Sequence, residues 1–173
     1  IDYTHGDLGG CFGGNCKVAG GYDFVNNDNN PADDHGHGTH VAATAAGNGV
    51  LKGVAPGARI YAYKVLDSGG SGSWSSVISG IERAVDPNQD GDFSDHLNVI
   101  NLSLGSEYGS PDTPDSAALD LAMENGVVAV VAAGNSGPQN FTVNSPGASA
   151  KAITVGASDT VGASATIDFT SWL

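Results

Sequence analysis

The chain has 173 residues, of which 40% are hydrophobic and 14% charged, a composition that predicts one globular domain and excludes a disordered chain. Its formal net charge is -13, from 19 acidic and 6 basic residues. Because nucleic acids and anionic membranes are bound through clusters of Lys and Arg, this charge argues against both as partners and favours cation binding.

The termini and the cysteines give information on the cellular compartment of the protein. No apolar stretch approaches the roughly 20 residues that a membrane helix needs, and no basic segment before an apolar core marks a signal peptide. The chain begins at Ile1 without Met, which suggests a processed or truncated product. We expect Cys11 and Cys16 to form a disulfide in an oxidising compartment, because two ligands alone do not make a zinc site.

Alternating apolar residues predict a strand over residues 18–25, and a polar loop follows it. Small apolar residues then predict a helix over residues 38–47 that is buried on most sides. The start of this helix carries three of the five histidines, namely His35, His37 and His40. Gly36 and Gly38 destabilise a helix start unless unusual dihedrals or a close approach require them, so a histidine that merely packs does not explain them.

The histidines allow two chemical interpretations. With Asp33 and Asp34 they offer nitrogen and oxygen ligands, but a helical pair of zinc ligands is four residues apart with a glutamate between. His37 and His40 are only three apart. Alternatively, a histidine held at a helix start can act as the general base that takes a proton from a hydroxyl nucleophile. The spacing favours the general base.

The run His37-Gly38-Thr39-His40-Val41-Ala42 resembles the histidine signature of the subtilisin-like serine proteases. The resemblance implies that His37 is the general base and that His40 is a buried structural partner. The first ten residues resemble the loop behind the aspartate motif of that family, so the orienting aspartate is expected before Ile1. In this loop Asp7 resembles a position that binds calcium in many relatives, and a solvated turn residue is the alternative.

An apolar run predicts a strand over residues 58–66, with a glycine-rich loop behind it. The loop lacks the Lys-Ser/Thr ending of a phosphate-binding loop, which argues against a nucleotide site. By resemblance to the family, Gly70, Ser71 and Gly72 are an extended edge that pairs with the substrate backbone. The glycines leave space there, and free N–H and C=O groups would bind a peptide by strand addition.

Apolar residues at helical spacing predict a helix over residues 74–85. Behind it, oxygen-bearing side chains alternate as in the first half of a calcium loop, with Gly91 at the sixth place. These side chains belong to Asp86, Asn88, Asp90 and Asp92. The twelfth position is Leu97 where a full loop has Glu, so the match is partial. A structural calcium ion and a solvated acidic turn are the two alternatives.

Two further strands are predicted over residues 98–104 and 127–133, with a helix over 113–125 between them and a last strand over 152–156. Pro114 suits the first turn of that helix. By resemblance, residues at the ends of the two strands bind substrate: Ser103, Leu104 and Gly105 as one wall of the primary specificity pocket, with Ala133 and Gly134.

Asn135 follows the strand over residues 127–133, at the edge where a parallel α/β sheet presents functional groups. The resemblance gives Asn135 the role of oxyanion donor, whose side-chain N–H stabilises the charge that develops on the attacked carbonyl. The alternative is a turn asparagine in the left-handed conformation.

The order of strands and helices predicts a doubly wound α/β fold, with a mostly parallel sheet and helices on both faces. The resemblance makes residues 1–173 a partial subtilisin-like peptidase domain. Phe169-Thr170-Ser171 resembles the segment before the nucleophile region, but no Gly-Thr-Ser-Met-Ala occurs in the 173 residues. The resemblance therefore implies a catalytic serine beyond Leu173.

The resemblance implies a secreted serine endopeptidase that hydrolyses peptide bonds of protein substrates through an acyl-enzyme, with its own propeptide as a further partner. We expect the 173 residues alone to be inactive, because His37 lacks its nucleophile and its orienting carboxylate. One alternative is a catalytically dead, calcium-dependent binding module. A dinucleotide-binding protein of similar architecture would need a glycine fingerprint after the first strand, and none is present.

Overall fold

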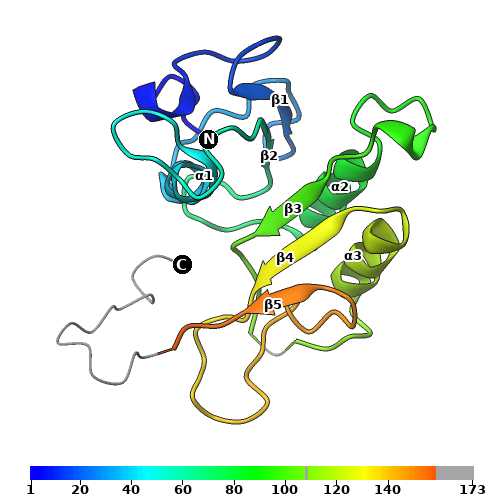
Figure 1. Cartoon of the computed structure of the whole chain (residues 1–173). Coiled ribbons are helices and arrows are strands. Elements are labelled where there is room, and N and C mark those ends of the chain that lie inside the picture. Colours follow the sequence, from blue (N-terminus) through cyan, green and yellow to red (C-terminus); the bar gives the residue numbers. More distant parts are fainter. Residues whose placement is uncertain (108, 159–173) are drawn as a thin grey trace, which may run out of the picture. The chain divides into compact units, whose positions relative to one another are not determined.

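The computed structural model describes residues 1–107 and 109–158. The chain divides into two compact units, with the boundary between Gly80 and Ile81. All eight predicted strands and helices are confirmed, in the predicted order (Figure 1). They are β1 (Val18–Asp23), α1 (His37–Ala46), β2 (Ile60–Lys64), α2 (Trp74–Val85), β3 (Val99–Leu102), α3 (Pro114–Glu124), β4 (Val128–Ala132) and β5 (Ile153–Val155). Two short 3-10 helices are added, η1 (Gly6–Leu8) and η2 (Phe93–Asp95).

The first unit is built on the parallel pair β1 and β2. Its core is formed by Leu8, Val18, Ala42 and Ala62. β1 ends two residues earlier than predicted because the carboxylate of Asp23 accepts the N–H groups of Val25 and Asn26 and turns the chain out of the strand. The predicted disulfide between Cys11 and Cys16 is confirmed and closes the loop before β1.

The second unit contains a parallel sheet in the order β3-β4-β5. The parallel pairing of the strands is thus confirmed, although the described strands fall into two sheets. α3 packs on β4, and the core on this side includes Leu119, Ala129 and Val131. The other face of the sheet exposes apolar side chains. They are Val99, Val128, Ile153 and Val155, with 57%, 40%, 53% and 53% of their surface accessible.

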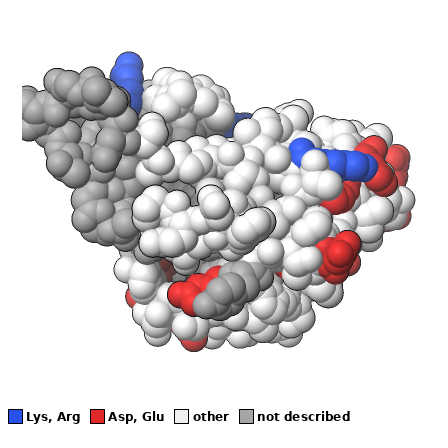
Figure 2. All heavy atoms as spheres, turned by 90° about the horizontal axis from the view of Figure 1, so that it is seen from below, with Lys and Arg blue, Asp and Glu red and all other residues white. Residues whose placement is uncertain are grey.

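Charged side chains are sparse on one face of the described part of the chain. On the face drawn in Figure 2, Lys and Arg side chains are few and separate, and most atoms belong to uncharged residues. Among the helices of the described part of the chain, none has the length and apolar character of a membrane-spanning helix.

Candidate active site

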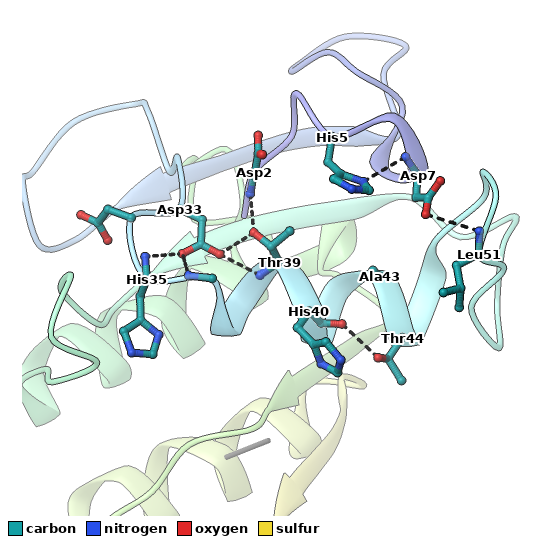
Figure 3. A pocket seen from close by; sticks show the side chains of 12 residues that line it. Asp2, His5, Asp7, Asp33, His35, Thr39, His40, Ala43, Thr44 and Leu51 are labelled. Atoms are coloured by element: carbon teal, nitrogen blue, oxygen red, sulfur yellow. Dashed lines mark hydrogen bonds between the residues drawn. The ribbon is translucent and has the colours of Figure 1, made fainter. Parts of the chain in front are cut away.

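His37 is the first residue of α1, one residue earlier than the predicted start of the helix. The N-cap is Gly36, which has a left-handed backbone with φ of 100° and no side chain to accept the free N–H groups of the first turn. The carboxylate of Asp33 takes this role (Figure 3). It accepts the N–H groups of His35, Gly36 and Thr39 at 2.9, 2.8 and 2.9 Å.

These hydrogen bonds keep Asp33 ionised. Burial raises the pKa of Asp33, but the N–H of Gly36, the hydroxyl of Thr39 and the N–H of His35 lower it by more. The net result is a pKa of the Asp33 carboxyl well below its ordinary value. The start of α1 is therefore held by a charged acceptor, whose hydrogen bonds are stronger than those of a neutral one.

The loop before α1 is also tied to β2 by an ion pair. The Lys64 ammonium lies 2.7 Å from Asp34 and 3.3 Å from Asp23, and the side chains of Lys64 and Asp23 are 9% and 2% exposed. Burial lowers the pKa of Lys64, but the carboxylates of Asp34 and Asp23 raise it by more, to a net value above the ordinary one. Lys64 therefore remains a cation and fixes the loop that delivers His37.

The other two histidines of the cluster differ from each other in surroundings. The rings of His35 and His37 lie 6.5 Å apart, and a Cβ on Gly70 would lie 3.1 Å from Nε2 of His35. His35 thus sits against the predicted substrate edge. His40 is exposed, so its expected burial is wrong. The reason is that α1 buries Ala42 and Ala46 and leaves the face with His40 open.

That open face of α1 lines a pocket of about 660 Å³ (Figure 3). The pocket is formed within the first unit, and its lining includes His40, Ala43 and Thr44 of α1 together with Asp2 and Leu51. The expectation that α1 is buried on most sides therefore fails on this face.

The predicted edge of Gly70, Ser71 and Gly72 is a tight loop rather than a free strand. The C=O of Ser71 accepts the N–H of Asp67 at 2.7 Å, and its N–H donates to the Asp67 carboxylate at 3.0 Å. The N–H of Gly70 is also bound to Asp67, at 2.9 Å. The expectation of free backbone groups is therefore wrong for both groups of Ser71 and for the N–H of Gly70.

The predicted pocket residues of the second unit lie at one edge of its sheet. Ser103, Leu104 and Gly105 follow β3, and Ala133, Gly134 and Asn135 follow β4. β3 and β4 are adjacent and parallel, so the two segments leave the sheet at the same carboxyl end. β3 ends at Leu102, earlier than predicted, and leaves residues 103–105 outside the sheet.

A third segment, residues 143–145, connects these two, and no motif in the sequence assigns it to the site. Ser145 pairs with Ser106 on one side, and the N–H of Asn144 donates to the C=O of Ala133 at 3.0 Å on the other. The Asn144 side chain contacts both segments, at Gly105 after β3 and at Gly134 after β4. A Cβ on Gly105 would lie 3.0 Å from its Nδ2, and a Cβ on Gly134 would overlap its Oδ1 at 1.3 Å.

Asn144 is also unusual in its hydrogen bonding. Its Oδ1 is buried and has no hydrogen-bond partner among the described residues. Unpaired buried polar atoms are rare in folded proteins. No spacing in the sequence reveals this residue, because its contact with Gly105 joins positions far apart in the chain.

A buried polar network holds the segment of Asn144 in place. The Ser145 hydroxyl donates to the Asp115 carboxylate at 2.6 Å and lies 2.7 Å from the Thr113 hydroxyl. Thr113 and Asp115 belong to the start of α3, and both Ser145 and Asp115 are buried. Residues 143–145, which lie between the segments after β3 and β4, are therefore fixed to α3 of the same unit.

Asn135 is exposed at the end of β4, behind Gly134 with φ of 94°. The described non-glycine residues with positive φ are Asn27, Gln89 and Phe141. The alternative of a left-handed turn asparagine is therefore excluded, and the exposed amide is free to meet a ligand from solvent.

The acidic loop between α2 and η2 uses its side-chain oxygens on its own backbone. Asp86 accepts the N–H groups of Asp90 and Gly91 at 3.2 and 3.0 Å. Asn88, Asp90 and Asp92 each accept the N–H of the residue two positions later. Within residues 1–107 and 109–158, no group of three His, Cys, Asp or Glu residues is arranged to hold a metal ion. Calcium at this loop stays a prediction, and its binding would require these oxygens to turn.

Asp7, the other residue with a predicted calcium role, also binds backbone. Its carboxylate accepts the N–H groups of Val50 and Leu51 at 2.8 and 3.4 Å. It thereby ties η1 to the loop after α1. The segment Phe169-Thr170-Ser171 lies outside the described residues.

Comparisons with known proteins identify the family of the chain. The chain matches the subtilase family over residues 1–172. It is 51% identical to the minor extracellular protease Vpr of Bacillus subtilis (strain 168) over 166 residues, which cover 91% of this chain and 19% of Vpr. It is 38% identical to the serine protease AprX of the same organism, over 91% of this chain and 36% of AprX.

Subtilisin DY of Bacillus licheniformis is 47% identical over 149 residues, which cover 83% of this chain and 50% of that protein. The chain thus spans half or less of the length of these three relatives. A match along almost the whole chain, with identities well above 30%, shows the family. The chain belongs to the subtilase family of serine proteases.

Proposed function

We propose that the protein containing these residues is a serine endopeptidase that cleaves peptide bonds through an acyl-enzyme. His37 acts as general base toward a serine outside the 173 residues, and Asn135 donates a hydrogen bond to the oxyanion. Residues 103–105 and 133–134 form the walls of the pocket for the side chain before the cleaved bond. Asn144 lies at its floor.

The observation that carries this proposal is the fixed start of α1. His37 stands at its first position, between residues whose N–H groups are held by one ionised carboxylate. A general base has to be held within hydrogen-bond reach of the proton that it accepts, and this arrangement fixes its backbone in advance.

Protein or peptide substrates and a secreted location complete the proposal. The excess of acidic residues favours peptides over nucleic acids. Among the described residues, the loop hydrogen bonds with Asp67 leave Gly72 and the C=O of Gly70 for pairing with a substrate backbone. Secretion is supported by the disulfide and by the name of the extracellular relative Vpr. A structural calcium ion and the protein's own propeptide are further proposed partners.

Replacement of the base tests the proposal. In the full-length protein, we expect His37→Ala to lower kcat for a peptide ester by at least about 10⁴-fold. The loss of a triad member in subtilisin, which belongs to the same family, lowers kcat by factors on the order of 10⁴ to 10⁶, and we adopt that range. The matched control is His40→Ala, which changes an exposed histidine of the same helix and is expected to act much less.

The 173-residue chain is the second arm of this test. We expect it to hydrolyse no peptide ester at a measurable fraction of the full-length rate, since it contains no Gly-Thr-Ser-Met-Ala. Turnover by this chain that disappears in His37→Ala would show that the serine is not required as proposed. A full-length protein that binds peptides without cleaving them would favour the binding module instead.

A further inference from the structure

We propose that Asp33 and Thr39 are a pair of positioning residues for His37, which fix the start of α1 against the segment that begins at Asp2. The inference rests on the proposed role of His37 as general base. It concerns two side chains that have no assigned role in the reaction.

The pair forms a continuous chain of hydrogen bonds. The Thr39 hydroxyl has one hydrogen, which it donates to Oδ2 of Asp33. Its oxygen then accepts the backbone N–H of Asp2 at 2.7 Å. Figure 3 shows the two hydrogen bonds meeting at the Thr39 hydroxyl, one from Asp2 and one to the carboxylate of Asp33.

The same carboxylate holds the backbone on both sides of His37. Oδ1 accepts the N–H groups of His35 and Gly36, before the histidine, and Oδ2 accepts the N–H of Thr39, two residues after it. With its two oxygens Asp33 thus accepts four hydrogen bonds, three from N–H groups and one from the Thr39 hydroxyl. A shift of the His37 backbone would have to break some of them.

The chemistry of both residues suits this task. An ionised carboxylate has two oxygens that accept several hydrogen bonds at once, while an asparagine side chain offers one. A threonine hydroxyl donates and accepts at the same time, so it joins Asp2 to Asp33, while a valine of the same shape does neither. By resemblance, the segment of Asp2 follows the aspartate motif. The pair therefore connects the two segments expected to supply the base and its orienting carboxylate.

A small displacement of a general base has a large effect on rate. A misplacement of about 1 Å can lower the rate roughly 100-fold without any change in the reacting groups. The proposed substrate edge in the same unit, residues 70–72, is not among the hydrogen-bond partners of the pair in the described part of the chain. Loss of the pair should therefore act on kcat and leave KM nearly unchanged.

The test uses the full-length protein and a peptide ester. We expect Thr39→Val and Asp33→Asn to lower kcat by about 10- to 100-fold, with KM within about twofold of its original value. Thr39→Ser keeps the hydroxyl and should recover kcat to within about threefold. The matched controls are Thr44→Val, a threonine of the same helix whose hydroxyl donates to the C=O of His40, and Asp28→Asn, an acidic residue of the preceding loop. Both controls should keep kcat within about twofold.

Thermal unfolding of each variant separates positioning from folding. The inference requires that kcat falls in samples that are fully folded at the assay temperature. An unchanged kcat in Thr39→Val, or equal kcat values for Thr39→Ser and Thr39→Val, would overturn it. If hydrolysis depends on His37 in these samples, such a result leaves the proposed function intact. If His37→Ala keeps full activity, the proposed function fails and this inference fails with it.

Discussion

At the scale of single residues, one polar side chain in each unit makes the main contacts of the proposed site. In the first unit, the carboxylate of Asp33 holds the backbone around His37. In the second unit, the Asn144 side chain stands between two glycines, and its buried Oδ1 has no hydrogen-bond partner in the described part of the chain. Asp33 fixes the backbone around His37, and Asn144 fills the space between Gly105 and Gly134.

Removal of the Asn144 side chain should enlarge the proposed specificity pocket. We expect Asn144→Gly to raise kcat/KM of the full-length protein about tenfold for peptides with a large aromatic residue before the cleaved bond. The amide that separates Gly105 from Gly134 is then gone, and filling of an apolar pocket discriminates by about 1–3 kcal/mol. A panel of peptides that differ only at this residue measures the preference. Asn140→Gly, at an exposed asparagine in the same connection, is the control, and an unchanged preference in Asn144→Gly would contradict the prediction.

The ion pair of Lys64 with buried Asp23 should contribute to stability. We expect Lys64→Met to lower the free energy of unfolding by about 3 kcal/mol, because Asp23 then remains as a buried charge without its cation. Lys52→Met removes an exposed lysine and should change it by less than about 0.5 kcal/mol. Denaturant unfolding at pH 7 gives both values.

The same pair predicts how stability depends on pH. Burial raises the pKa of Asp23, but the N–H and amide of Asn26, the N–H of Val25 and Lys64 lower it by more, to a net value below the ordinary one. Its stabilising contribution is therefore complete above the ordinary carboxyl pKa of about 4 and is lost as the pH falls toward the lower folded-state value. The difference between the original chain and Lys64→Met should narrow below about pH 4. A difference that grows on acidification would contradict this assignment.

At the scale of elements, the apolar pattern is sufficient to predict the described α-helices and strands but not the two short 3-10 helices, while side chains decide where the elements end. β1 stops at Asp23 because its carboxylate binds the next two free N–H groups. β3 stops at Leu102, and residues 103–105 stand outside the sheet. Such ends depend on local hydrogen bonds that a pattern of apolar residues does not contain.

The candidate site is predictable where it consists of a contiguous motif. Local sequence identifies His37 and the ends of β3 and β4, and their positions at a helix start and at one sheet edge are confirmed. The sequence suggests Asp33 only as a metal ligand and assigns Asn144 no role in the site. Both act through contacts that spacing does not reveal, the Asn144 contact across two strand ends and the Asp33 contacts around a glycine N-cap.

The acidic loop after α2 gives a prediction at this scale. If it binds calcium, addition of the ion to about 100 times its dissociation constant should stabilise the chain by about 2.7 kcal/mol and raise the thermal midpoint by roughly 5–10 °C. Asp86→Asn combined with Asp90→Asn should abolish the shift, and Asp95→Asn, outside the alternating set, should keep it. A midpoint that does not respond to calcium would remove the ion from the proposal and leave a solvated acidic turn.

At the scale of the whole molecule, the parallel α/β architecture follows from the order of strands and helices. The division of the described strands into two sheets does not follow from it. The spacing of apolar residues indicates which residues of a strand face the core, but it does not indicate which strands pair. The described strands form one pair and one sheet of three, in two compact units. Family membership, in contrast, can be expected from short motifs alone and is confirmed along residues 1–172.

The exposed face of the three-stranded sheet should make the isolated chain associate with itself. We expect the double variant Val99→Thr, Ile153→Thr to remain monomeric at concentrations at which the original chain forms oligomers, because both side chains are more than half exposed on that face. Val50→Thr changes a fully exposed valine of a loop in the first unit and should have no effect. Sedimentation velocity over a range of concentrations measures the distribution. Equal association of the double variant and the original chain would contradict this role of the face.

This apolar face should also determine how fast the purified chain loses monomer during storage. Encounters between two such faces are bimolecular, so the initial loss of monomer should scale with the square of the protein concentration. Dilution should therefore lengthen the time for which the chain stays monomeric. Sulfate should shorten it, because sulfate strengthens the burial of apolar surface. Cooling should lengthen it, because the hydrophobic driving force weakens at low temperature.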